Sequence, residues 1–223
     1  MRLCFLDSKS KTAINITRLR KYNFETRRII ADWQNKLAGL IVLCNGTPDD
    51  IVLGILAYHL NGTKVVGIVK PSNKRHLSSL SETKTYLDLN VTKIFYLIDQ
   101  EDFELDDLFS RIESEMQNIG IEYTLGLERE RVRIYNCILP NKSFTIAIVV
   151  NGLSEIVTDK HCIEDHLIKA GDIQNNQDTK ATWESLIDQT RNNVFRKLKT
   201  SEIATEIFIQ QRIGLDTLFE LSN

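Results

Sequence analysis

The stretch GLIVLCNGTPDDIVLGILAYHLNGTKVVGIVK, residues 39–70, decides the fold class of this chain. It opens with a continuous apolar run that Asn45-Gly46 ends, a pattern typical of a buried parallel strand. A helix start follows, with a candidate cap, a first-turn proline and two acids at the positive end of the helix dipole: Thr47, Pro48, Asp49 and Asp50. After Asn61-Gly62, a second apolar run predicts another strand. Strand, helix and strand in this order predict a parallel β-α-β unit.

The same alternation continues outward in both directions. We expect further strands at residues 1–8, 91–98, 131–139 and 144–152, and helices at 16–37, 75–89, 103–120, 163–171 and in 180–219. This order predicts an α/β fold with a Rossmann-like, mostly parallel sheet flanked by helices. Three parts are expected: a basic N-terminal extension (1–39), the α/β domain (40–170) and a C-terminal helical segment packed on it (171–223).

Composition narrows the class of protein. The chain has 223 residues, 42% of them hydrophobic and 26% charged, which fits a soluble globular domain. The formal net charge of -2 gives no overall basic field. Residues 1–40 nevertheless carry nine Lys or Arg against three Asp or Glu, which fits either a nucleic-acid surface or a solvated helix face. Four scattered cysteines indicate reduced thiols, and no segment reaches the roughly 18 apolar residues of a membrane helix, so we expect a cytoplasmic protein without a membrane partner.

Polar clusters follow two of the predicted strands. One is CNGTPDD, residues 44–50, and the other is DQED, residues 99–102. Ligand sites of open parallel sheets lie at the carboxyl ends of the strands. If the strand conformation persists, alternation places Asp99 and Glu101 on one side, where two carboxylates suit a hard cation such as Mg²⁺. The alternative is a set of acids that stabilises the N-terminus of the next helix by roughly 0.3–1 kcal/mol each.

Four motifs in this order resemble the Toprim family, in particular small stand-alone Toprim proteins related to overcoming-lysogenisation-defect nucleases. LCNGTPDD stands where that family has Glu-Gly-x-x-Asp, and LIDQED stands where it has Asp-x-Asp. CILPNKS resembles its Leu-Pro-x-Asn strand end, and HCIEDHLIK resembles the helix that opens with an acidic pair. The resemblance covers roughly residues 40–170 and implies a Toprim-like fold.

The resemblance also implies a metal site. Asp99, Glu101 and Glu164 would bind Mg²⁺, while Asn45 and Asp49 occupy the positions of catalytic residues. The family has a glutamate where this chain has Asn45, and an amide cannot abstract a proton at neutral pH. Asp49 or Asp50 would therefore have to act as the base. For Glu164, a helix-start acid without a ligand role is the alternative.

The implied function is a Mg²⁺-dependent protein that acts on or binds nucleic-acid phosphodiesters. Lys70, Lys74 and Arg75 follow the second strand and would hold the phosphate backbone, unless they form a solvated loop. A non-catalytic interaction or regulatory module of the same fold, in a nucleic-acid or defence assembly, is the main alternative. A homo-oligomer or a protein partner also remains open. The sequence contains neither a Walker-type loop nor a G-x-G-x-x-G loop, so it does not favour an unrelated nucleotide-binding protein. We expect His161 and His166 at the surface.

Overall fold

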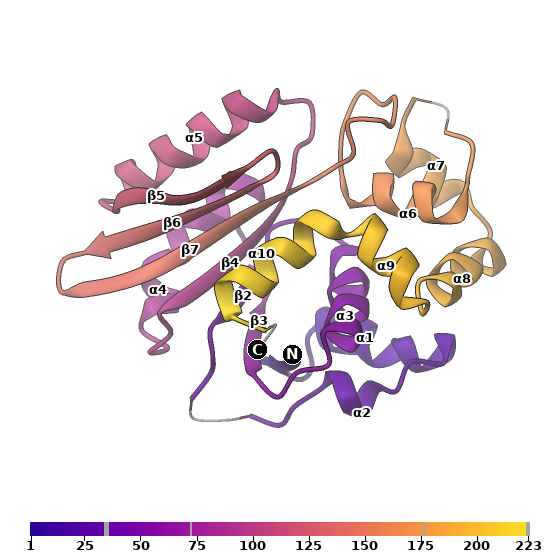
Figure 1. The fold of residues 1–223 in the computed structure, drawn as a ribbon, viewed down its shortest axis with the longest axis horizontal. Coiled ribbons are helices and arrows are strands. Elements are labelled where there is room, and N and C mark those ends of the chain that lie inside the picture. Colours follow the sequence, from indigo (N-terminus) through magenta and orange to yellow (C-terminus); the bar gives the residue numbers. More distant parts are fainter. Residues whose placement is uncertain (34–35, 72, 176, 222–223) are drawn as a thin grey trace.

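The computed structural model describes residues 1–33, 36–71, 73–175 and 177–221. Within these ranges one seven-stranded sheet has the order β1-β3-β2-β4-β7-β6-β5 (Figure 1). The strands are β1 (Arg2–Phe5), β2 (Leu40–Leu43), β3 (Val65–Val69), β4 (Lys93–Asp99), β5 (Glu122–Arg129), β6 (Val132–Leu139) and β7 (Lys142–Asn151). The first five strands in that spatial order are parallel to one another, whereas β6 and β5 add to β7 as antiparallel hairpins.

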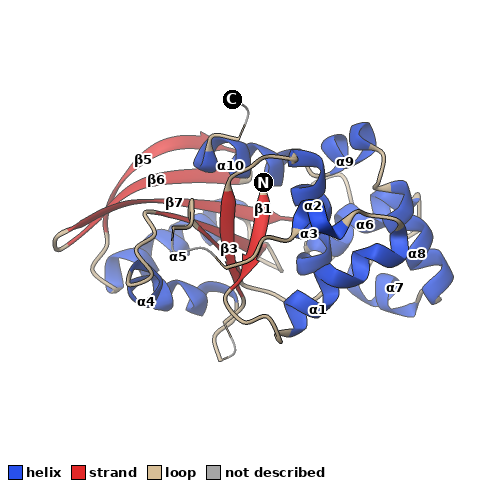
Figure 2. Cartoon of the chain, turned by 90° about the horizontal axis from the view of Figure 1, so that it is seen from below, coloured by secondary structure: helices blue, strands red, loops and turns tan. Residues whose placement is uncertain are grey.

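Helices cover both faces of the sheet. They are α1 (Lys11–Arg18), α2 (Thr26–Ile29), α3 (Asp49–Leu60), α4 (Thr83–Leu87), α5 (Leu105–Asn118), α6 (Ile163–Gly171), α7 (Thr179–Ser185), α8 (Asp188–Lys197), α9 (Ser201–Ile207) and α10 (Ile209–Phe219). Short 3₁₀ helices span Leu19–Tyr22 and His76–Glu82. Figure 2 shows α4 and α5 on one side of the sheet and α10 on the other. None of the helices in the described ranges has both the length and the apolar character needed to cross a membrane.

The N- and C-terminal parts of the chain share one hydrophobic core with the sheet. Leu3 from β1, Ile41 from β2 and Leu215 from α10 belong to the same buried cluster. Helix α10 lies directly on the sheet because Gly214 has no side chain; a methyl group there would overlap Val149 and Phe95. A second cluster on the opposite face packs α5 against β4 and β6. The helices therefore sandwich the sheet, as expected for an α/β protein.

The structure confirms the α/β class and the mostly parallel sheet flanked by helices. The single helix expected at 16–37 is wrong. The chain forms α1, a 3₁₀ turn and α2 instead, because Asn23 takes a left-handed conformation (φ 66°) that ends the helical run. Residues 34–35 of that prediction lie outside the described residues. Strand β5 was not expected, and Pro48 rather than Thr47 occupies the cap position of α3.

Candidate acidic site at the carboxyl ends of the strands

The acidic site lies where three neighbouring parallel strands end. Strand β4 lies between β2 and β7, and its last residue, Asp99, pairs in register with Asn151 at the end of β7. The turn after β2 leads into α3, whose first turn contains Asp49. Helix α6 begins at the same edge and contributes Glu164 in its first turn. The β-α-β order of the chain thus brings acids from three distant segments to one edge of the sheet.

Asn151 joins two of these acids directly. Its Nδ2 donates hydrogen bonds to Asp49 Oδ1 and to Asp99 Oδ1, both at 2.9 Å. Its Oδ1 accepts a hydrogen bond from Gln211 Nε2 of α10, also at 2.9 Å. Because Asn151 Nδ2 carries two protons and Oδ1 can only accept, this one amide bonds to all three partners. Asn151 is fully buried, so the two carboxyl groups are held together away from water.

The backbone around Asp99 is also fixed by side chains. Its N–H donates to Asn45 Oδ1 at 3.1 Å, and its carbonyl oxygen accepts from His76 Nε2 at 2.8 Å. The N–H of Ile163, in the first turn of α6, donates to Asp99 Oδ1 at 3.3 Å. The amide oxygen of Asn45 therefore positions Asp99. Asn45, which stands where the Toprim family has a glutamate, thus has a structural role in this chain.

Burial and like charges disfavour ionisation of these acids. Burial raises the pKa of Asp99 to about 8; the hydrogen bond from Asn151 opposes this shift, and the charges of Glu164 and Glu101 add to it. The pKa of Asp49 is raised well above its usual value, first by burial and then by the charges of Asp99 and Glu164. Burial also raises the pKa of Glu164. A cation among these groups would relieve both penalties.

Glu101 occupies a different position from the one that strand alternation predicts. The strand ends at Asp99, and Glu101 has a left-handed backbone (φ 57°). Its N–H and carbonyl oxygen pair with His161, at 2.8 and 2.9 Å, so the β4–α5 loop is tied to the segment before α6. Glu101 is half-buried, and its charge acts on Asp99 from the rim of the site. Asp102 is exposed to solvent.

The donor set matches Mg²⁺ in chemistry because all of its acids are oxygen ligands. In the part of the chain that the structure describes, no group of three or more His, Cys, Asp or Glu side chains is already arranged around one point as metal ligands. Asp49 and Asp99 meet at the nitrogen of Asn151, and Glu164 acts on both of them electrostatically. Cation binding would therefore require side-chain rotations within a site whose backbone is already formed.

The three predicted phosphate-binding residues differ in their surroundings. The charge of Lys70 lowers the pKa of both Asp49 and Asp50, opposing the effect of burial, so Lys70 lies on the side of the acids. Lys74 instead donates to Ser81 Oγ at 2.7 Å and lies 3.8 Å from a carboxylate oxygen of Glu82. Arg75 is exposed. The structure brings the first of these cations to the acidic site, and it pairs the second with other residues.

His166 was expected at the surface, and this prediction is wrong. The side chain is buried, with Nδ1 donating to the carbonyl oxygen of Ile207 at 2.7 Å. Its Nε2 therefore accepts, from the N–H of Gly152 at 3.3 Å and from Gln211 at 3.2 Å. Burial lowers the pKa of His166 to about 4, so the ring is neutral at pH 7. Leu167 and Ile168, which are also buried, follow it on α6.

His161 is also not a free surface residue, although its side chain remains partly exposed. Its Nδ1 bonds to Asp165 Oδ2 at 2.7 Å, and Asp165 is fully buried. Asp165 Oδ1 accepts from Thr179 at 2.6 Å. The second acid of the Ile-Glu-Asp motif therefore anchors the segment before α6, whereas the charge of Glu164 acts on Asp49 and Asp99.

Asn151 is the central residue that sequence reasoning missed. One signal could have found it: the apolar run IAIVVNG ends in Asn151-Gly152, as the run LIVLCNG ends in Asn45-Gly46. Both asparagines end parallel strands on either side of β4, and both bond to Asp99. Gln211 lies 60 residues further along the chain, and no local signal marks it.

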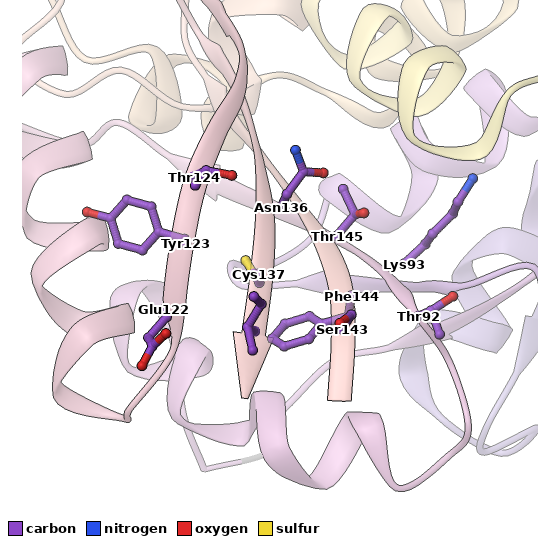
Figure 3. Close-up of a pocket in the computed structure, with 11 residues that line it drawn as sticks. Thr92, Lys93, Glu122, Tyr123, Thr124, Asn136, Cys137, Ser143, Phe144 and Thr145 are labelled. Carbon is purple, nitrogen blue, oxygen red and sulfur yellow. The ribbon is translucent and has the colours of Figure 1, made fainter. Parts of the chain in front are cut away.

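A separate groove of about 510 Å³ lies on the open face of the sheet near its antiparallel edge (Figure 3). The register places Thr124, Asn136, Thr145 and Lys93 in one row across β5, β6, β7 and β4. The groove contains one carboxylate, Glu122, and one ammonium group, Lys93, and none of the residues of the acidic site line it. Its lining lacks a group of acids, so the acidic site is the better candidate for chemistry.

Comparisons with models of protein families, with curated proteins and with solved structures gave no match for this chain. The function is therefore inferred from the acidic site, its burial and its electrostatics.

Proposed function

We propose that the chain is a Toprim-like protein that binds Mg²⁺ at the acidic site and acts on, or binds, nucleic-acid phosphodiesters. The observation that supports this most strongly is the pair Asp49 and Asp99, joined by Asn151 and influenced by the charge of Glu164. Burial of these acids is costly, because the charges of Lys70 and Lys180 offset the effect of burial only in part and the pKa values of Asp49 and Glu164 stay raised. Such arrangements are concentrated at functional sites. Asp49 joins Asp99 and Glu164 as a ligand, and Glu101 lies at the rim.

The remaining residues would position the substrate. Asn151 and Asn45 hold Asp99 in place, so that its carboxylate presents a fixed oxygen to the cation. The N-termini of α3 and α6 point to the same edge and favour an anion there. Lys70 adds a positive charge on the same side. The bound Mg²⁺ would stabilise charge on the reacting phosphate.

Calorimetric titration of Mg²⁺ and Mn²⁺ into the protein tests the metal site. We expect binding that is tighter at pH 8 than at pH 6, with proton release, because the cation must displace the proton held by Asp99. Asp99→Asn should abolish it, whereas Asp102→Asn, a matched change at an exposed acid, should leave it intact. Absence of cation binding to the wild-type protein would refute the proposal.

Cleavage of labelled single-stranded and duplex DNA and RNA separates the two forms of the proposal. An active phosphodiesterase should cleave one of them with Mg²⁺ or Mn²⁺ and lose this activity in Asp99→Asn. The non-catalytic alternative is favoured by Asn45, which replaces an acid and is bonded to the backbone of Asp99. That alternative predicts binding of nucleic acid that weakens with salt, without turnover.

A further inference from the structure

A cavity of about 260 Å³ adjoins the acidic site. It lies between the start of α3, the first turn of α6 and helices α7 and α8, and Glu164 forms part of its wall. Three aromatic side chains line it: Tyr22, Trp183 and Phe195. The ring centroids of Tyr22 and Phe195 are 5.0 Å apart, and those of Trp183 and Phe195 are 5.6 Å apart. The aromatic wall is therefore a packed unit rather than a set of loose surface rings.

Polar residues of α7 and α8 line the cavity together with these rings. Asp188 is paired with Arg191, whose Nη2 lies 2.6 Å from Asp188 Oδ1. Glu184 and Asn192 supply an acceptor and an amide that can both accept and donate. The charge of Lys180, on the same helix as Glu184, acts on both Glu184 and Glu164.

We propose that this cavity binds the base and sugar of a single nucleotide, with the phosphate of that nucleotide at the acidic site. This inference rests on the proposed function and names the part of the nucleic acid that the protein recognises. Aromatic side chains provide stacking surfaces for bases, and carboxylate and amide groups pair with the edges of bases. Glu164, shared by the cavity and the acidic site, sets the two parts of the ligand next to each other.

The size of the cavity limits the ligand. Pockets for drug-sized molecules enclose roughly 300–1,000 Å³. A cavity of about 260 Å³ accommodates one nucleoside and excludes a stacked base pair. The substrate class that follows is a nucleotide at the end of a strand, or one in an unpaired region, rather than the interior of a duplex.

Fluorescence of Trp183 reports on the cavity. The chain has two tryptophans, and Trp33 is 58% exposed, so Trp33→Phe leaves a folded protein with one reporter. Each of the four 5′-nucleoside monophosphates is titrated with and without Mg²⁺. We expect a saturable change in Trp183 emission for at least one of them, and at least about tenfold tighter binding with Mg²⁺. Ribose 5-phosphate with Mg²⁺, which lacks the base, should produce no change.

A pair of matched variants tests the position of the base. Asn192 lines the cavity and is half-buried, so Asn192→Phe should fill it and weaken nucleotide binding at least about tenfold. Asn193→Phe makes the same change at the next, exposed residue of α8 and should leave binding unchanged. Both variants should keep the Mg²⁺ affinity measured by calorimetry in the absence of nucleotide.

The outcomes separate this inference from the proposed function. If Mg²⁺ binds but none of the nucleotides changes Trp183 emission, or if the two variants behave alike, the cavity is a packing feature and the inference is wrong while the metal site stands. If Mg²⁺ does not bind to the wild-type protein, the proposed function fails, whatever the nucleotides do. Nucleotide binding that ignores Mg²⁺ would place the phosphate elsewhere and overturn the inference.

Discussion

Asp99 and Asp102 are three residues apart and occupy opposite environments. Asp99 is 6% exposed and accepts hydrogen bonds from Asn151 and Ile163, whereas Asp102 is exposed in the loop before α5. The acids at the start of α5, Asp106 and Asp107, are exposed as well. The difference comes from the neighbouring elements, because β2, β7 and α6 surround the end of β4 but not the loop that follows. An acidic cluster in the sequence thus divides into a buried half and a solvated half.

Of the changes considered, Asn151→Ala should destabilise the buried acids Asp49 and Asp99 most. The change removes the donor shared by Asp49 and Asp99 and also leaves Gln211 without its acceptor. We expect the free energy of unfolding to fall by about 2–4 kcal/mol, measured by urea denaturation at pH 7. Asn136→Ala, at an exposed strand position, should cost less than about 0.5 kcal/mol. Equal losses in the two variants would mean that the buried pair depends little on Asn151.

The pH dependence of stability is the next effect in size. In metal-free buffer, the folded protein keeps a proton on Asp99 up to about pH 8, whereas an unfolded aspartate loses it near pH 3.9. The folded state therefore binds more protons in this range, and stability falls as pH rises. From pH 6.5 to 8 we expect a slope of at most about 1.4 kcal/mol per pH unit for this one group.

The range below pH 6.5 is less informative because His166 acts in the opposite direction. Its folded pKa of about 4 lies below the usual value for histidine, so its contribution to stability is lost as pH falls from 6.5 through 4. Between pH 6.5 and 8, Asp99→Asn should flatten the decline, whereas Asp102→Asn should retain it. Burial lowers the pKa of the Met1 amino group to about 6, so this group opposes the decline up to about pH 8, and the test is the difference between the wild type and Asp99→Asn. An identical pH dependence of these two proteins above pH 6.5 would contradict the assignment of a proton to the buried pair.

Gln211→Ala should change the free energy of unfolding less than Asn151→Ala or the change of pH does. The change removes one neutral donor from Asn151 and one from His166, while Asn151 keeps both carboxylate partners. We expect a loss of about 1 kcal/mol in the free energy of unfolding, measured by the same urea denaturation. Gln189→Ala, at an exposed position on α8, is the control and should be close to neutral. A loss as large as that of Asn151→Ala would show that α10, rather than Asn151, holds the acids together.

The strands and their carboxyl ends could be predicted because their signals are local. Apolar runs such as residues 94–98 fit buried strands, and Asn-Gly ends two of them. Prediction failed where a single backbone conformation decided the result: Asn23 breaks a helix that its apolar spacing favours. It also failed at β5, whose largely exposed residues carry little apolar alternation.

By itself, the sequence determined the parallel α/β order and predicted that Asn45 and Asp49 or Asp50 lie near Asp99 and Glu101 at one edge of the sheet, whereas Glu164 was added only by the resemblance to the Toprim family. Periodicity and turn residues act over a few positions, so they can be recognised without the rest of the chain. The tertiary structure alone decided which acids are buried, which of them Asn151 joins and why Asp99 holds its proton. These properties depend on desolvation and on hydrogen bonds between segments 50 or more residues apart, and no local pattern encodes them.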